Sequence, residues 1–470
     1  MNLRRCLTLW MWMFLMGLAG LSRAAERPNI ILMLSDDQGW NGLSVAMHPE
    51  VAASKGDIFH TPNLEKLAGQ GMRFSSAYAP APVCSPTRIS IQTGKSPAQL
   101  HWTKAAPAVP NQKLVEPKLI KDLSVNETTI AELLKKAGYT TAHYGKWHIG
   151  GGGPGSHGYD EHDGDTGNEN AFKFTDPNPV DIFGMAERAA AFMKKSQQAH
   201  KPFYIQLSWN ALHAPELAMK ATQAKYENLA TESNSKKVAT AAITENLDTG
   251  VGKVLEAVEQ LGLSKNTYVI YMSDNGSGGG GKRGGLSGGK GSVWEGGIRV
   301  PLIVRGPGVA ANSWCDVPVV CYDWLPTFCA MAGITDMDIP KGVEGGDISK
   351  LLLNQGNGTV KRTREELVFH FPHYQSDDGP HSSIRLGNLK LIYFFEDDRV
   401  ALFDLSTDIG ERNDLSGRMP REAAMLKTRL NQYFTSVNAQ LPTKNSEYDP
   451  SRATAPRKGN KGGKKGMEKK

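Results

Sequence analysis

The sequence predicts an α/β fold: a large, mostly parallel sheet flanked by helices, plus a smaller C-terminal subdomain with a short antiparallel sheet and a helix. Two observations lead to this class. Apolar, β-branched runs alternate with helical patterns through most of the chain, which is typical of parallel strands joined by helices. In the last third, strand-like runs follow one another closely, which favours antiparallel pairing.

The first predicted elements are a buried strand at Asn29–Ser35 and a short helix at Pro62–Gln70, where proline suits the first turn. An amphipathic helix follows at Thr128–Ala137 and is stopped by Gly138. The further elements of this part are strands at Tyr139–Tyr144, Phe203–Trp209, Tyr268–Ser273 and Leu302–Arg305, and a long helix from about 236 to 261.

The last third has four predicted strands and a helix: Leu367–Phe371, Ser383–Leu386, Lys390–Phe395, Ala401–Leu405 and Arg421–Thr435. We therefore place an α/β domain at 26–360 and a C-terminal α+β subdomain at 361–441. Residues 442–470 are polar and end in Lys/Gly-rich low complexity, which predicts a disordered basic tail.

Residues 1–25 have the pattern of a signal peptide. Arg4 and Arg5 precede one mostly apolar stretch, and small residues around Ala24 suit cleavage. An uncleaved membrane anchor is the alternative, which the shortness of the stretch disfavours. No later segment is long and apolar enough to span a bilayer, so we expect a secreted or periplasmic protein without an integral membrane segment after signal removal.

The formal net charge of +6 does not describe the body of the protein. Residues 1–25 carry +3 and residues 452–470 carry +7, so the part between them carries −4. The basic charge lies at the two ends and not on a binding face, and we therefore expect no nucleic-acid partner.

Three cysteines in the second half are an odd set: Cys315, Cys321 and Cys329. One disulfide among them would leave one free thiol. Their spacing lacks the paired pattern of a zinc site, so core packing is the favoured interpretation.

Polar residues stand directly after four of the predicted strands. In an open parallel sheet, ligands bind outside the carboxyl ends of the strands, so these residues are expected to meet along one rim. They are Asp36 and Asp37, Lys146 and His148, Asn210 and His213, and Asp274 and Asn275.

Four of these residues offer only oxygen ligands: Asp36, Asp37, Asp274 and Asn275. Calcium takes six to eight oxygen ligands, whereas magnesium takes fewer and keeps water, so calcium is the favoured ion. One such pair alone more often caps a turn. Two pairs that each end an apolar strand favour a metal site.

Four basic residues could hold a small tetrahedral oxyanion: Arg88, Lys146, His148 and Lys290. Each alone is more often a solvated lysine or a structural histidine. Cys84 is two positions before Pro86, which suits the first turn of a helix, so the sulfur is expected near a helix N-terminus that favours an anion. These residues indicate a metal-assisted hydrolase with an activated nucleophile, and they leave sulfate and phosphate esters equally open.

Three segments, in this order, resemble the formylglycine-dependent (type I) sulfatases of the alkaline phosphatase superfamily. Cys84-Ser85-Pro86-Thr87-Arg88 matches the CxPxR signature. Gly145 to Gly150 matches a second signature, and Lys290 with Trp294 to Arg299 matches the segment of the leaving-group lysine. The similarity extends from Arg27 to about Leu415.

The resemblance implies a mechanism for these positions. A formylglycine-generating maturation enzyme would oxidise Cys84 to formylglycine, whose hydrate attacks sulfur with one hydroxyl and expels sulfate with the other. Asp36, Asp37, Asp274, Asn275 and modified Cys84 would bind one calcium ion. Arg88 and Lys146 would hold the hydrate, His148 would assist elimination, and His213 and Lys290 would contact the bridging oxygen.

The substrate is expected to be a sulfated small molecule or glycan. Pocket candidates are His101, Trp102, His370 and His373, since aromatic and histidine side chains suit a sugar. For His101 and Trp102, a packed loop is the alternative. Two other functions stay open: a phosphodiesterase or phosphonate monoester hydrolase of the same superfamily, and a noncatalytic protein that binds sulfated glycans.

Overall fold

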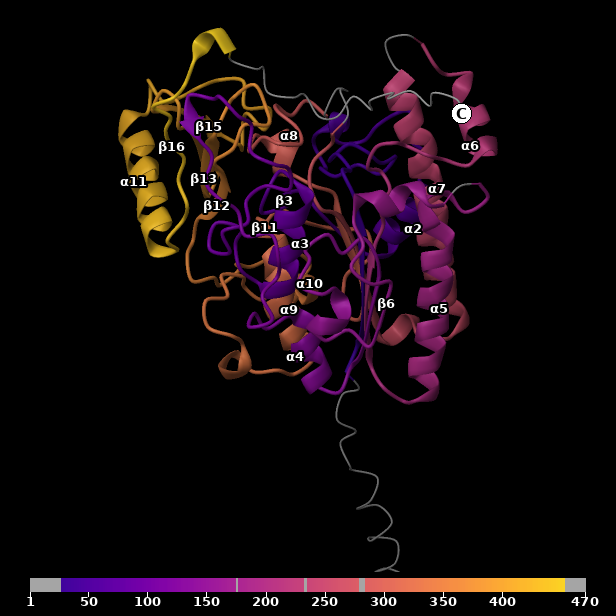
Figure 1. The fold of residues 1–470 in the computed structure, drawn as a ribbon. Helices are drawn as coiled ribbons and strands as arrows, with labels where there is room; N and C mark the ends of the chain where they lie inside the picture. Colours follow the sequence, from indigo (N-terminus) through magenta and orange to yellow (C-terminus); the bar gives the residue numbers. More distant parts are fainter. Residues whose placement is uncertain (1–26, 175, 232–234, 279–283, 453–470) are drawn as a thin grey trace, which may run out of the picture.

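A computed structural model describes residues 27–174, 176–231, 235–278 and 284–452. Its central feature is an eight-stranded sheet with the order β10-β2-β9-β8-β1-β7-β5-β6 (Figure 1). Five of the seven neighbouring strand pairs are parallel, and the two pairs made by β9 are antiparallel. The strands are β1 (Asn29–Ser35), β2 (Met72–Phe74), β5 (Thr140–Gly145), β6 (Glu161–His162), β7 (Phe203–Ser208), β8 (Thr267–Ser273), β9 (Leu302–Arg305) and β10 (Ser313–Cys315).

β1 shows why this sheet is covered on both faces. All seven of its residues are buried, as expected of a central parallel strand. Alternate side chains enter opposite cores, with Ile31 and Met33 on one side and Ile30, Leu32 and Leu34 on the other.

Each core is closed by its own group of helices, which Figure 1 shows on the two sides of the sheet. The first group is α2 (Pro62–Gln70), α5 (Ile182–Gln198) and α7 (Ser235–Gln260), with α6 (Lys220–Glu227) against α7. The second group is α3 (Cys84–Thr93), α4 (Ile130–Lys136), α9 (Trp324–Met331) and α10 (Ser349–Leu353).

The C-terminal part is a four-stranded antiparallel sheet with a helix on its outer face (Figure 1). Its inner face packs against Tyr78, Val293 and Val320 of the α/β part. With the large sheet, this confirms the predicted fold class. The elements are β12 (Leu367–Phe371), β13 (His381–Leu386), β14 (Leu389–Phe394), β15 (Arg399–Asp404) and α11 (Pro420–Ser436).

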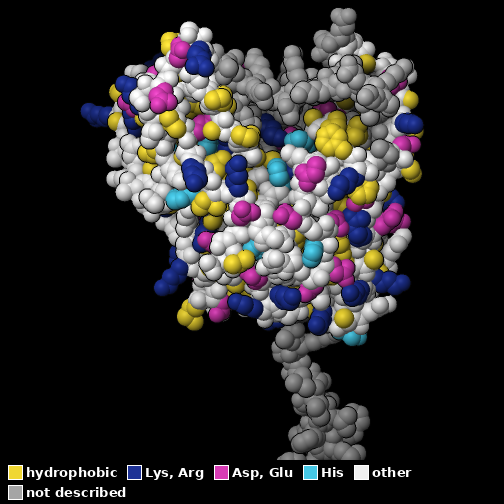
Figure 2. Space-filling model, in the orientation of Figure 1, with side chains coloured by type: hydrophobic (Ala, Val, Ile, Leu, Met, Phe, Trp, Pro, Cys, Tyr) yellow, Lys and Arg dark blue, Asp and Glu magenta, His cyan; other side chains and the backbone are white. Residues whose placement is uncertain are grey.

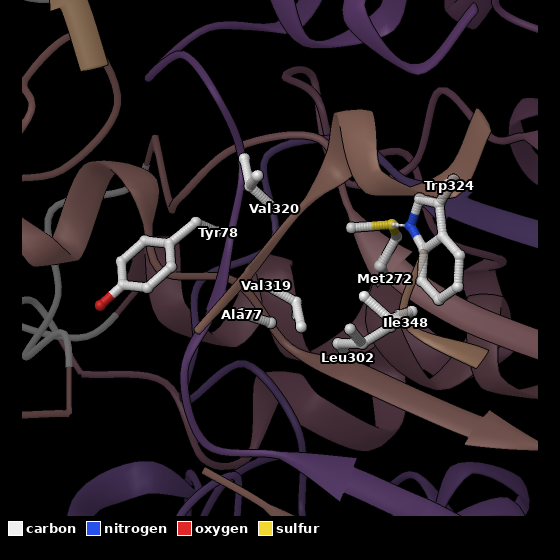
Figure 3. A pocket seen from close by; sticks show the side chains of 8 residues that line it. All are labelled: Ala77, Tyr78, Met272, Leu302, Val319, Val320, Trp324 and Ile348. Carbon is white, nitrogen blue, oxygen red and sulfur yellow. Dashed lines mark hydrogen bonds between the residues drawn. The ribbon is translucent and has the colours of Figure 1, made fainter. Parts of the chain in front are cut away.

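A small parallel pair, β3 (Ala77–Tyr78) with β11 (Val319–Val320), joins the two parts. Figure 3 shows the apolar pocket beside it, where the ring of Tyr78 points away from the other seven side chains. The indole of Trp324 donates a hydrogen bond to Met272 Sδ at 3.0 Å, and none of the described residues that line the space is charged. This pocket is part of the core and not a site for a polar ligand.

α5 and α9 are two of the described helices that were not among the predicted elements. α5 begins directly after the proline-rich segment 177–181, which obscures its start. α9 is apolar on all sides and carries Pro326, so it has no amphipathic period.

The predicted disorder from residue 442 is wrong for 442–452, where the chain pairs with an earlier segment. β16 (Thr443–Lys444) pairs with β4 (Leu114–Val115), and Asn111 holds Asp449 through two hydrogen bonds. The predicted signal peptide at 1–25 and the tail residues 453–470 lie outside the described residues. Within the described part, no helix combines the length and the apolar character needed to cross a membrane.

Candidate active site

Four neighbouring strands deliver the predicted site residues to one rim, as expected. β8, β1, β7 and β5 are consecutive in the sheet, and hydrogen bonds tie their ends together. Asp274 N donates to Ser35 O at 3.1 Å, and Lys146 N donates to Ser208 O at 2.7 Å. Gly145, just before Lys146, has φ 90°, and a Cβ there would lie 2.2 Å from Ser208 O, so only glycine fits this turn.

Cys84 is the first residue of α3 and is 2% exposed. The preceding Val83 is extended, so the helix starts at the cysteine, where unpaired N–H groups favour an anion. The Cys84 Sγ lies 3.5 Å from His148 Nδ1. The predicted position at a helix N-terminus is therefore confirmed.

Arg88 lies one turn later on the same helix and is also buried. Its Nε and Nη2 donate to Asp274 Oδ2 at 3.0 and 2.8 Å, and its Nη1 donates to Lys146 O at 2.6 Å. Burial acts to lower the pKa of Arg88, but the carboxylates of Asp274 and Asp36 raise it above its usual range. Arg88 is therefore a fixed cation that links three strand ends.

The carboxyl groups of Asp36 and Asp274 are fully buried and close to each other. Burial and the charge of Asp36 raise the pKa of Asp274 to about 8. Burial also acts to raise the pKa of Asp36, but Lys146, His213 and Arg88 hold it below its usual range. Lys146 Nζ forms an ion pair with Asp36 Oδ2.

Asp37 and Asn275 complete the oxygen-rich side of the site. Lys290 Nζ lies 2.6 Å from Asp37 Oδ1, and Asn275 Nδ2 donates to the same oxygen at 2.8 Å. Burial acts to lower the pKa of Lys290, but Asp37 raises it well above the usual range. Lys290 is thus held at the rim, although its loop lies 253 residues from Asp37 in sequence.

The donor set fits a hard divalent cation. Asp36 Oδ1 and Asn275 Oδ1 are buried and have no hydrogen-bond partner among the residues that the structure describes. Ligand atoms of Asp36, Cys84 and Asp274 all lie within 4.8 Å of one another. Oxygen ligands of this kind suit calcium.

The two predicted site histidines differ in position. His148 faces Cys84, and burial together with Lys146 and Arg88 lowers its pKa to about 3, so its ring is neutral. It has φ 59°, an uncommon value outside glycine. His213 is partly exposed, and its Nδ1 lies 2.8 Å from Ala214 O. His213 N is bonded to Asn210 O, which keeps both residues at the end of β7.

The four predicted pocket residues have their polar atoms engaged elsewhere. His101 Nε2 contacts Asn438 O at 2.8 Å, and Trp102 Nε1 donates to Lys104 O at 3.1 Å. The rings of His370 and His373 are buried, and both nitrogens of each have protein partners. The structure does not join these residues to the Cys84 group.

A set of C-terminal residues that the sequence analysis missed holds the loop of Lys290. His381 Nε2 accepts from Val293 N at 3.0 Å, and Glu411 accepts from Glu295 N at 2.7 Å. The buried Lys390 Nζ lies 2.8 Å from Glu295. These contacts join positions about 90 to 120 residues apart, and no local pattern signals them.

Thr166 and Asp163 were also missed, and they support the strand end that carries Lys146. Asp163 Oδ2 accepts from Gly145 N at 2.7 Å, and Thr166 O accepts from His148 N at 2.8 Å.

Figure 2 shows histidine, acidic and basic side chains beside a hydrophobic patch on the upper part of the face in view. α8 (Glu295–Ile298), which follows the Lys290 loop, lies at this upper end in Figure 1.

Comparison with known proteins gives this arrangement a family. Residues 28–334 match the Sulfatase family model, and residues 289–440 match the model for the C-terminal part of N-sulphoglucosamine sulphohydrolase. The chain is 28% identical to arylsulfatase A of Homo sapiens, covering 86% of each chain. It is 32% identical to N-acetylgalactosamine-6-sulfatase of Rattus norvegicus, covering 66% of this chain and 63% of that protein.

The fold is also shared with solved structures. A crystal structure of Ps i-CgsB in complex with k-i-k-neocarrahexaose has a TM-score of 0.72 and 24% sequence identity, covering 87% of this chain and 92% of that one. The family model covers well over half of the chain, and its match includes Cys84, the rim residues and Lys290. The chain belongs to the sulfatase family and is a sulfuric ester hydrolase.

Proposed function

We propose that this sulfatase hydrolyses a sulfate ester of a carbohydrate or glycan, using formylglycine made from Cys84 and one bound calcium ion. One observation carries the proposal: Cys84 begins a helix inside a buried group of carboxylates and fixed cations. One carboxylate oxygen and one amide oxygen of this group have no hydrogen-bond partner among the described residues. A working thiol or a purely structural cysteine does not need such surroundings.

The residues that would hold calcium are Asp36, Asp37, Asp274 and Asn275, with an oxygen of modified Cys84. Three carboxylates here are balanced by Arg88, Lys146 and Lys290, so a divalent cation adds the positive charge that suits an anionic ester. When bound, calcium would withdraw electron density from the sulfate oxygens.

The reaction at Cys84 would take place in two steps. In the first, one hydroxyl of the formylglycine hydrate bonds to sulfur, the bond from sulfur to the alcohol oxygen breaks, and the alcohol leaves with a proton. In the second, the other hydroxyl loses its proton, the bond from carbon to the sulfate oxygen breaks, and the aldehyde re-forms as sulfate leaves.

The chain's own residues have separate tasks in these steps. Arg88 and Lys146 would orient the hydrate and neutralise charge, since both are buried beside Cys84. His148, 3.5 Å from the sulfur of Cys84, would take the proton during elimination. Lys290 and His213 would assist the departing alcohol.

Relatives and neighbours support a carbohydrate substrate. One relative is named for N-acetylgalactosamine 6-sulfate, and one structural neighbour was solved with a neocarrahexaose. The predicted signal peptide at 1–25 agrees with access to such polymers in the periplasm or outside the cell.

Mass spectrometry of the Cys84 peptide, from protein made in its native host, tests the nucleophile. We expect the mass of an aldehyde or its hydrate, and an unmodified cysteine would contradict the mechanism. Cys84→Ala should abolish turnover of 4-nitrophenyl sulfate without changing the fold.

Two further outcomes would favour the alternative functions. A higher rate on bis(4-nitrophenyl) phosphate than on 4-nitrophenyl sulfate would favour a phosphodiesterase. Binding of sulfated glycans without any turnover would favour a noncatalytic protein.

A further inference from the structure

A second cavity lies beside the proposed centre, on the side of α5. It has a volume of about 290 Å³, which is enough for one sugar ring but not for a long oligosaccharide. It lies between the loop after β6, the start of α5 and the ends of β5 and β7. Its wall therefore comes from the same end of the sheet as the Cys84 site.

Three lining residues connect the cavity with the catalytic rim: Gly145, Thr166 and Asn210. Gly145 directly precedes Lys146, and Thr166 O accepts from the backbone of His148. Asn210 O accepts from the backbone of His213, and its side chain donates to Gly167 O at 3.1 Å. The cavity is thus linked through backbone contacts to the segments that carry Lys146, His148 and His213.

One part of the cavity lining is polar and is held together by ion pairs. Arg188 Nη2 donates to Asp163 Oδ2 at 2.9 Å and to Asp181 Oδ2 at 2.6 Å. Asp163 also accepts from Gly145 N, which ties this group to the rim. Carboxylates and a guanidinium at fixed positions are suitable partners for hydroxyl groups on a ring.

The backbone at this place is strained in a way that serves the cavity. Val180 and Asp181 have φ values of 52° and 58°, and a β-branched residue with positive φ is a real outlier. Backbone strain of this kind is often found at binding sites. Here it places Val180, Asp181 and the first turn of α5 around one space.

The outer edge of the cavity presents an aromatic ring. Phe174 lines the cavity and is 37% exposed, so one part of its ring stays open to solvent. Phe172, two residues earlier, is 59% exposed and does not line the cavity. A partly exposed aromatic ring beside polar groups suits a pyranose, whose C–H groups form an apolar face and whose hydroxyl groups project mainly from the ring edge.

We propose that this cavity is the subsite for the sugar ring of the substrate, with Phe174 as its stacking platform and the Asp163–Arg188–Asp181 group as its hydroxyl partner. The inference rests on the proposed function, because it presumes a sulfated carbohydrate at the Cys84 centre. It adds specificity residues that lie outside all the signature segments.

The test compares Phe174→Ala with the matched control Phe172→Ala. Substrates are 4-nitrophenyl sulfate, N-acetylgalactosamine 6-sulfate and sulfated carrageenan oligosaccharides, with each sugar also tried as an inhibitor of aryl sulfate turnover. For any sugar that wild type hydrolyses or binds, Phe174→Ala should lower kcat/KM, or weaken inhibition, about tenfold relative to the aryl sulfate. Phe174→Trp should restore most of the loss, and Phe172→Ala should change the ratio less than twofold.

The outcomes separate the two proposals. Absence of wild-type turnover on every sulfate ester, from protein with modified Cys84, would overturn the proposed function. Turnover of the aryl sulfate with no sugar hydrolysed or inhibiting would leave the proposed sulfate ester hydrolysis at Cys84 standing and overturn the sugar subsite. Equal losses for Phe174→Ala and Phe172→Ala, or an unchanged ratio in both, would also overturn it.

Discussion

Two buried polar groups of the molecule resemble each other in residue composition but differ in how many of their polar atoms have hydrogen-bond partners. The Cys84 group combines carboxylates, cations and a histidine near the rim. The second, which we call the Glu116 cluster, consists of Thr103, Lys104, Glu116 and His373. It also has a carboxylate, a cation and a histidine, all nearly inaccessible.

Within the Glu116 cluster every polar atom has a protein partner. Glu116 Oε1 accepts from Lys104 Nζ at 3.1 Å and from Val109 N at 2.8 Å. Glu116 Oε2 lies 2.9 Å from Lys104 Nζ and 2.7 Å from His373 Nδ1. His373 Nε2 lies 2.7 Å from Thr103 Oγ1. Burial lowers the pKa of His373 and has a larger effect than Glu116, which acts to raise it, so a neutral ring is favoured. With its one proton on Nδ1, the ring donates to Glu116 and accepts at Nε2 from Thr103.

The Cys84 group is incomplete by the same measure. Asp36 Oδ1 and Asn275 Oδ1 are buried and unpartnered within the described part of the chain. A buried acceptor without a donor is costly, so it persists where a ligand supplies the missing contact. Between these two groups, therefore, the difference lies in the completeness of hydrogen bonding and not in residue type.

Removal of the metal should have the largest effect. Chelation by EGTA should reduce sulfate ester turnover below detection, because the oxygen-rich side of the site would lose the charge that balances the ester. Added calcium should restore turnover and raise the unfolding temperature. Glu116→Gln protein should show the same response. Full activity in excess chelator, with calcium absent by elemental analysis, would contradict the assignment.

Asp274→Asn should follow in size. The amide keeps the shape and an acceptor for Arg88, but removes the charge that a cation needs. We expect turnover to fall on the order of 10³-fold, corresponding to about 4 kcal/mol of transition-state stabilisation. The stability of the calcium-free protein should change much less. Near-normal kcat would mean that Asp274 only positions Arg88.

Much of the active site could be predicted, because its information is local. Asp36 and Asp274 each follow an apolar run that can only be a buried strand, and Pro86 marks the helix that starts at Cys84. The topology of a parallel sheet then brings the strand ends together. The fold class follows from the same alternation.

The rest depended on long-range contacts that leave no local pattern. His370 and His373 look like pocket residues in sequence, but His373 meets Glu116 across 257 positions and becomes structural. α9 lacks an amphipathic period because its first six residues, Trp324 to Cys329, are all buried. The cavity beside α5 is lined by Val180, whose φ of 52° is uncommon for a β-branched residue and has no signal in the sequence.

Glu116→Gln tests the other side of the comparison. Loss of the carboxylate charge leaves Lys104 buried with weaker partners, and breaking a buried pair of this kind costs about 3 kcal/mol. We expect a lower free energy of unfolding by urea denaturation, with kcat for 4-nitrophenyl sulfate within about threefold of wild type. A large loss of kcat in a stably folded variant would place the cluster in the reaction instead.

The smallest effect concerns His370, which packs near the Glu116 cluster and contacts Ser382 Oγ at 2.7 Å and Gln440 O at 2.9 Å. Burial lowers its pKa to about 3, against about 6.5 in the unfolded chain. Below pH 6.5 the ring of His370 therefore binds a proton in the unfolded state but not in the folded state. The free energy of unfolding consequently falls as the pH decreases toward 3. The slope for one such group is about 1.4 kcal/mol per pH unit.

His370→Gln removes this pH dependence. The difference in free energy of unfolding between wild type and variant should therefore shrink by about 2 kcal/mol between pH 6.5 and 5.0. Parallel curves over that interval would mean that the ring is protonated in the folded protein and that its two contacts hold a cation.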